Sequence, residues 1–229
     1  MTKNLFLLAG FIAIFVITGS AFAVGPWVME WYAFDFVPDT GTHPEGIAED
    51  WLLQIYSKQE SAFSELGRIP GPEETVMYKG VEMSWKVASV VDVNDDRNLS
   101  NGIYGGVNGD MSNYVFYGII AVTSPNAQDT VMNVAQDDQL KVWIDGELVA
   151  EDTAWTGGAT TTVPHEISLK KGLNIMLFKV SEEGGGDYLN VNFDAEDLEF
   201  LADLTQIPGA SVSPVGSLSA TWGAIKSYR

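Results

Sequence analysis

The sequence predicts an all-β fold, an antiparallel β-sandwich (jelly-roll-like) with one or two short accessory helices. In the second half of the chain, apolar residues recur at every second position, which is the period of a strand with one buried face. Roughly seven or eight such segments follow one another at short spacing, which is typical of antiparallel sandwiches. Gly-rich turns rather than helices separate them, and this favours an antiparallel sandwich over a parallel α/β sheet.

The N-terminus has the three parts of a secretory signal peptide. Lys3 precedes an apolar run over 5–17, and small residues lead to Ala23, where we expect cleavage. The alternative is an uncleaved anchor, but the run has about 13 residues and a membrane span needs about 20. We therefore expect residues 1–23 to be removed, leaving a protein that is secreted to the extracellular space or cell surface and has no membrane contact.

The mature chain is expected to form a single domain over residues 24–200. Sandwiches of about 200 residues commonly fold as one unit with a sufficient core. Because the sequence contains no cysteine, disulfides, thiol catalysis and cysteine-based zinc sites are all excluded. Residues 201–229 lose the strand pattern and are rich in Gly, Ser and Pro, so we expect a linker and a short C-terminal tail, either frayed or used for docking.

Two segments precede the main run of strands. Five aromatic residues lie between Trp27 and Phe36, and this stretch is expected to be an extended segment against the sandwich. Residues 45–66 carry apolar side chains near helical spacing and acidic residues in the first turn, which predicts one helix packed on the sheet edge. From residue 81 to 91 one side of the chain is mostly apolar and the other mostly polar, which predicts a half-buried strand; the residues expected on the first side are Val81, Met83, Trp85, Val87, Ser89 and Val91. The run 114–122 is apolar almost throughout and predicts a central strand.

The most informative stretch runs from Asp137 to Val149. Two adjacent aspartates lead into an alternating strand, Leu140 to Ile144, and Asp145-Gly146 then predicts a hairpin turn. A return portion follows over 165–193.

Together these motifs resemble the lectin-type β-sandwich modules of the protective-antigen and galactose-binding-like kind. The resemblance covers 81–193 and implies that the hairpin forms the sandwich core. In the calcium-dependent members it also implies that the acidic pair, here Asp137 and Asp138, coordinates Ca²⁺, which in turn binds glycan hydroxyls. The chain departs from the pattern at Gln139, where such members usually have Gly.

Asp137 and Asp138 are also the first choice for a metal site on chemical grounds, because Ca²⁺ takes hard oxygen ligands and adjacent carboxylates can supply several. The alternative is a solvated loop. The second choice is Asp92, Asp96 and Asn98. That segment is not an EF-hand loop, because Arg97 and Ile103 occupy the positions of its Gly and bidentate Glu, and an ordinary Asx turn is the competing interpretation.

Trp155, Asp187 and Tyr188 are the predicted ligand-binding residues. Sugar sites pair an aromatic face with a few polar groups, and these three lie in loops that follow the predicted strands. Each aromatic could instead fill an edge of the core. Trp143 is in mid-strand and is expected to be packed under a helix or loop.

The formal net charge of −19 disfavours nucleic acid as a partner, since binding to phosphates needs clustered Lys and Arg. Catalysis has little support, because His43 and His165 lie in separate segments and no metalloprotease or nucleophile-elbow motif is present. The sequence thus predicts a secreted, non-catalytic module that binds an extracellular glycan, with Ca²⁺ as the expected cofactor. The alternative is a self-assembling structural subunit of a surface layer, matrix or filament, a homo-oligomer formed through Trp27–Phe36.

Overall fold

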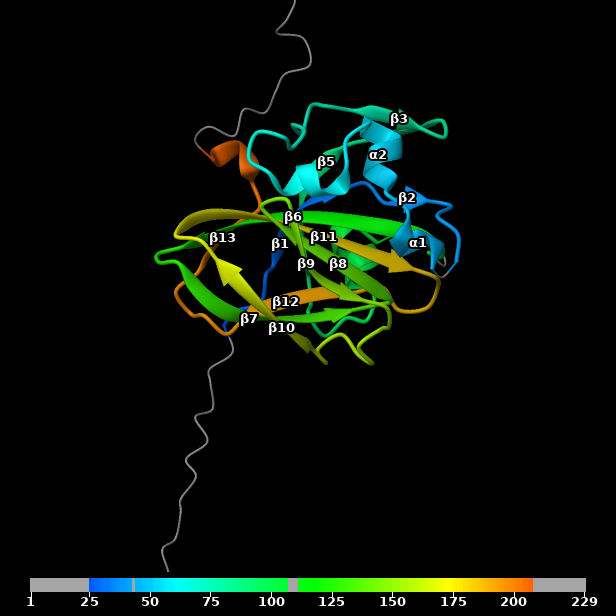
Figure 1. Cartoon of the computed structure of the whole chain (residues 1–229). Helices are drawn as coiled ribbons and strands as arrows, with labels where there is room; N and C mark the ends of the chain where they lie inside the picture. The colour runs from blue at the N-terminus through cyan, green and yellow to red at the C-terminus, as the bar shows by residue number, and fades with distance from the viewer. Residues whose placement is uncertain (1–24, 43, 107–110, 208–229) are drawn as a thin grey trace, which may run out of the picture.

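The computed structural model describes residues 25–42, 44–106 and 111–207. In this part of the chain every strand pair is antiparallel, and the strands form an all-β sandwich, so the predicted fold class is confirmed (Figure 1). The predicted signal peptide and the end of the predicted tail lie outside the described residues. No helix in the described ranges is long and apolar enough to cross a membrane.

The larger sheet contains eight strands. Its order is β5 (Trp85–Ser89), β1 (Glu30–Phe34), β6 (Tyr114–Ser124), β11 (Gly172–Glu182), β8 (Gln139–Ile144) and β9 (Glu147–Asp152), and β2 (Val37–Pro38) and β13 (Glu199–Leu201) also pair with β6. The smaller sheet has the order β10 (Val163–Leu169), β7 (Gln128–Gln136) and β12 (Leu189–Phe193). β3 (Val76–Tyr78) and β4 (Val81–Met83) form a separate hairpin.

The central strands β6 and β11 of the larger sheet are buried on both faces, because each face packs against a different layer. On β6, Phe116 and Ile120 point into the core shared with the smaller sheet, whereas Tyr117 and Ile119 point into a second core on the opposite face. Figure 1 shows α1, α2 and β3 on that opposite side, and β7, β10 and β12 on the other. The apolar run of the central strand follows directly from this three-layer arrangement.

The predicted single helix over 45–66 is wrong in its continuity. The segment forms three short pieces: α1 (Glu45–Ala48), α2 (Trp51–Tyr56) and the 3₁₀ turn η1 (Glu60–Ser64). Asp50 caps the start of α2, because its carboxylate accepts a hydrogen bond from the N–H of Leu53, and it also accepts from the N–H of Glu60 in η1. Ser57 then adopts a left-handed conformation with φ of 56°, which ends α2.

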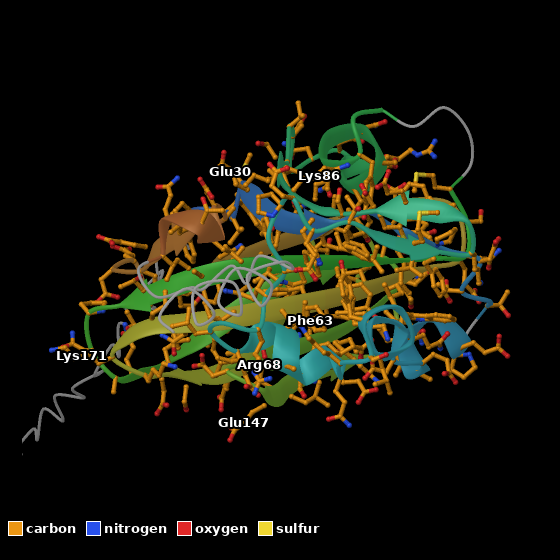
Figure 2. The ribbon with its side chains drawn as sticks, turned by 90° about the horizontal axis from the view of Figure 1, so that it is seen from above. Glu30, Phe63, Arg68, Lys86, Glu147 and Lys171 are labelled. Carbon is orange, nitrogen blue, oxygen red and sulfur yellow. The ribbon has the colours of Figure 1, made fainter. Side chains whose placement is uncertain are left out.

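A buried lysine ties these pieces to the sheet. Lys179 of β11 is fully buried, and its ammonium donates to the main-chain oxygens of Ile47 and Glu49 and, at 2.8 Å, to Oε1 of Glu60. The hydroxyl of Tyr117 donates to the same carboxylate oxygen. In Figure 2, seen from the helical side, Phe63 of η1 lies over the central sheet. The lysine thus provides hydrogen bonds to carbonyl oxygens that the end of α1 leaves without helical partners.

The aromatic stretch Trp27–Phe36 contains β1, which lies inside the larger sheet between β5 and β6. Its side chains are divided between the two cores, with Trp31 in one and Tyr32 and Phe34 in the other. The stretch is therefore already paired on both sides within its own chain, and in this structure it does not offer a free strand to a second copy.

The ordered domain extends beyond the predicted boundary at residue 200. β13 runs to Leu201, and the 3₁₀ turn η3 (Leu204–Gln206) follows it. Leu204 and Ile207 are buried in the core on the helical side. These apolar contacts make the start of the predicted linker part of the domain.

Candidate functional site

The acidic pair lies at one edge of the sandwich, where the chain passes from one sheet to the other. β7 of the smaller sheet ends at Gln136, and β8 of the larger sheet begins at Gln139. Asp137 and Asp138 form the connection, and the peptide bond between them is cis. In the pairing of β8 with β11, Ser181 lies opposite Gln139, so Glu182 at the end of β11 reaches the same edge.

Three carboxylates converge there. Within the described ranges, one group of acidic residues could hold a metal ion, namely Asp137, Asp138 and Glu182, each with an oxygen within 4.8 Å of the others. Asp138 accepts a hydrogen bond from the N–H of Glu183 at 3.0 Å. Glu182 is 2% exposed, and its Oε2 is buried without a hydrogen-bond partner. A buried, unpartnered carboxylate oxygen beside two further carboxylates fits an all-oxygen cation site, since hard cations such as Ca²⁺ prefer these donors.

The electrostatics of this group are those of partly buried acids that lie close together. Burial raises the pKa of Asp137 from 3.8 to about 7, helped by a hydrogen bond with Asp138 and by its charge. Burial likewise raises the pKa of Glu182 from 4.5 to about 9, and the charges of Asp138 and Asp137 add to the effect. Without a cation, the folded protein therefore holds protons here that the unfolded chain has released.

This predicts that the metal-free protein loses stability as pH rises. A carboxyl whose pKa is raised on folding binds more protons in the folded state, so the free energy of unfolding falls with pH from about 4 up to the folded pKa. The loss of stability due to Asp137 should therefore be complete near pH 7, and the loss due to Glu182 should continue up to about pH 9. Urea unfolding in EDTA between pH 5 and 9 measures it.

The variant Glu182→Gln is the control for this prediction. It removes the group with the higher pKa and should flatten the upper part of the profile. A metal-free protein whose stability rises between pH 5 and 9 would contradict the assignment.

Asp187 lies in the same region but is buried. It is 1% exposed, and its Oδ1 accepts hydrogen bonds from the N–H and hydroxyl of Ser100, while Oδ2 has no partner. The preceding Gly186 lies against the acidic group, because a Cβ there would come within 2.6 Å of Oδ2 of Asp137 and 3.0 Å of the Asp96 carbonyl oxygen. Glycine is thus required for this close approach, and Asp187 adds negative charge to the site without reaching solvent.

Trp155 and Tyr188 differ in exposure. The Trp155 loop (Thr153–Thr162) reaches the acidic connection, because the N–H of Thr156 donates to the Gln136 oxygen at 3.1 Å. Trp155 is 58% exposed, which leaves its ring available for contact. Tyr188 is 1% exposed and packs with Ala135 and Ala159, so its ring is not available for stacking; its main-chain oxygen accepts from the N–H of Asp137 at 3.1 Å.

The second-choice residues do not form a common set with one another. Asp92 accepts hydrogen bonds from the main chain and side chain of Asn94, which is the predicted Asx turn. Asn98 is buried and bonds to Leu189 and Asn190 of β12, a structural role. The carbonyl oxygen of Asp96 accepts a hydrogen bond from the N–H of Asp187 at 2.7 Å, and the charge of its carboxylate adds to the rise in the pKa of Asp137.

Glu182 is the functional residue that sequence reasoning missed. It comes at the end of a long apolar run and is followed by Glu183 and three glycines, a position in which acidic side chains are commonly solvated. Pairing β8 with β11 in the observed register would have placed it opposite Asp138. Trp143 was expected to be packed rather than exposed, and it lies 7% exposed in the core under the helical segment.

Comparisons with known proteins give only distant likenesses. No family model and no curated protein matches the sequence. Among solved structures, a PA14 domain of the MpAFP antifreeze protein matches at 16% identity over 76% of this chain and 83% of that one, with a TM-score of 0.39. A family 35 carbohydrate binding module from an environmental isolate matches at 13% identity over 42% of this chain and 80% of that one, with a TM-score of 0.31.

A third likeness is to a GH31 alpha-xylosidase from Xanthomonas citri, at 11% identity and a TM-score of 0.30. It covers 35% of this chain and only 9% of the enzyme. At such identities and TM-scores these likenesses assign no ligand and no activity to the chain.

Proposed function

We propose that this chain is a secreted, non-catalytic carbohydrate-binding module that holds Ca²⁺ with Asp137, Asp138 and Glu182. The observation that carries the proposal is the convergence of these three carboxylates, with a buried oxygen of Glu182 left unpartnered, beside a loop that exposes Trp155. Loops at one end of a sandwich are the usual place for binding residues.

In this proposal the ion and the aromatic ring contact different parts of the sugar. Bound Ca²⁺ would supply open coordination positions for sugar hydroxyls, because Ca²⁺ accepts six to eight oxygen ligands and three carboxylates leave some unfilled. The exposed ring of Trp155 would pack on the apolar C–H face of the sugar. The net charge of −19 favours neutral over anionic glycans.

The test is a glycan screen on residues 24–229 in Ca²⁺ and in EDTA, with particle size followed by light scattering. Calcium-dependent retention of neutral glycans by a monomer is expected. Calcium binding without retention of any glycan would contradict the carbohydrate role, and glycan retention that is unchanged by EDTA would contradict the ion's part in it.

Trp155→Ala is expected to weaken binding of a glycan found in that screen by about 10- to 30-fold, because aromatic anchors supply much of the free energy at such contacts. Since the side chain is 58% exposed, the free energy of unfolding should change by less than about 0.5 kcal/mol. Isothermal titration calorimetry and thermal melting measure the two quantities.

The matched control is Met77→Ala, which removes another exposed apolar side chain, 64% exposed, from β3 on the helical side. It should leave glycan affinity unchanged. Equal losses of affinity in the two variants would remove Trp155 from the site.

A further inference from the structure

The Trp155 loop is attached to the residues that adjoin the acidic ligands in sequence. Gln136 directly precedes Asp137 and exchanges hydrogen bonds with Thr156. The N–H of Thr156 donates to the Gln136 oxygen at 3.1 Å, and the N–H of Gln136 donates to the Thr156 hydroxyl at 3.2 Å. The main chain on one side of Trp155 is therefore fixed to the main chain that carries the acidic pair.

The side chain of Gln136 fixes the other side of Trp155. It is fully buried, and its Nε2 donates to the carbonyl oxygen of Ala154 at 3.1 Å and to Oδ2 of Asp152 at 3.4 Å. A single residue thus contacts both neighbours of Trp155, which itself remains exposed. Its Oε1 is buried without a hydrogen-bond partner, and an unpartnered buried oxygen lowers the stability of the folded state.

Gln139 makes a second connection of the same kind. Its Nε2 donates to the carbonyl oxygen of Thr153 at 3.4 Å, and its Oε1 accepts from the hydroxyl of Ser181 at 3.2 Å. Ser181 precedes Glu182, and its main-chain oxygen accepts from the N–H of Asp138. Gln139, which stands where the resembled modules usually have Gly, therefore joins the loop to Ser181, the residue before the third carboxylate.

We infer that Gln136 is a positioning residue that links occupancy of the carboxylate site to the placement of Trp155. An ion held by Asp137 restrains the main chain at Gln136, and the hydrogen bonds of Gln136 restrain both neighbours of Trp155. Fixing an aromatic anchor before the ligand arrives lowers the entropy lost on binding. This inference rests on the proposed calcium site and concerns how that site presents the sugar-facing ring.

The test is hydrogen exchange of the peptide that covers Thr153–Thr162, in Ca²⁺ and in EDTA, followed by mass spectrometry. In the unmutated protein Ca²⁺ is expected to slow exchange at Thr156 by about fivefold or more, the change that one strengthened hydrogen bond produces. In Gln136→Met the calcium-induced rise in melting temperature should persist, while the slowing in the loop should be smaller, because the variant loses the side-chain bonds to Ala154 and Asp152 and keeps only the main-chain bonds with Thr156.

Gln128→Met is the matched control, since Gln128 is the first residue of the same strand β7 and donates from its amide to Ser124 at the far end. It should retain the slowing. If Gln136→Met does not fold, Thr156→Val removes the hydroxyl bonds of the loop at nearly constant shape and should reduce the slowing.

The outcomes separate the two hypotheses. Absence of any calcium-induced rise in melting temperature in the unmutated protein overturns the proposed calcium site and this inference with it. A calcium-induced rise without slowing in the loop, or equal slowing in Gln136→Met, overturns the positioning role alone.

Discussion

Lys179→Met is expected to lower the free energy of unfolding by about 3–5 kcal/mol, because removing one partner of a buried ion pair leaves the other charge without compensation. Lys179 is fully buried, and Glu60 is 6% exposed. Burial raises the pKa of the Glu60 carboxyl and lowers the pKa of the Lys179 ammonium, so each depends on its partner to remain charged. Urea unfolding at pH 7 measures the loss.

The control for this prediction is Lys141→Met on the neighbouring strand β8. The ammonium of Lys141 lies 3.5 Å from a carboxylate oxygen of Glu151, whose side chain is 47% exposed, so the loss should be below about 1 kcal/mol. Adding Glu60→Gln to Lys179→Met should recover part of the stability, because no buried charge is then left unpaired. Equal losses in the two lysine variants would show that the helical pieces are held by apolar contacts alone.

The hairpin illustrates what local sequence determines. Asp145 and Gly146 have positive φ angles of 48° and 91°, as a two-residue turn between antiparallel strands requires. β8 and β9 pair around them, with Ile144 opposite Glu147. Alternation and turn chemistry are both local properties, so this part of the fold was predictable without knowledge of the rest.

The strand predicted over 81–91 shows where alternation fails. Met83 and Trp85 are buried as expected, but Val87 and Val91 are 46% and 78% exposed, and Ala88 is buried instead. Ser84 interrupts the strand between β4 and β5, since its N–H and hydroxyl both bond to the Asp35 carboxylate. The interruption depends on a residue nearly fifty positions away, which a local pattern does not contain.

The candidate site likewise contains residues that local sequence predicts and residues that it does not. Asp137 and Asp138 were recognisable because they adjoin a hairpin of characteristic sequence. Glu182 was not, because its approach depends on the pairing of β8 with β11, and β9 and β10 intervene in the sequence. Equally, the burial of Tyr188 results from packing against Ala159 in the Trp155 loop, a contact between segments that periodicity treats separately.

Asp137→Asn combined with Asp138→Asn is expected to remove the rise in melting temperature that Ca²⁺ causes in the unmutated protein. An ion that binds only the folded state stabilises it by about 2.7 kcal/mol at a hundredfold excess over Kd. For a domain of this size the rise is about 5–10 °C. Scanning calorimetry in Ca²⁺ and in EDTA measures it.

The same variant should have the opposite effect in EDTA. Burial, together with the neighbouring Asp138, raises the pKa of Asp137 to about 7, so ionised carboxylates destabilise the metal-free fold at pH 8, and neutral amides of similar shape relieve the repulsion. The variant should therefore melt higher than the unmutated protein in EDTA and lower in Ca²⁺. A change in overall charge would shift both conditions in the same direction.

Asp92→Asn with Asp96→Asn is the matched control, because it removes two carboxylates from the neighbouring loop while leaving the Asp96 carbonyl in place. This variant should keep the full calcium response. If the response persists in the first variant and disappears in the second, the ion binds at the loop over 92–98 rather than at the carboxylates that meet beside the Trp155 loop. If both variants retain it, neither acidic group holds the ion, and the role proposed for Trp155 must stand without calcium.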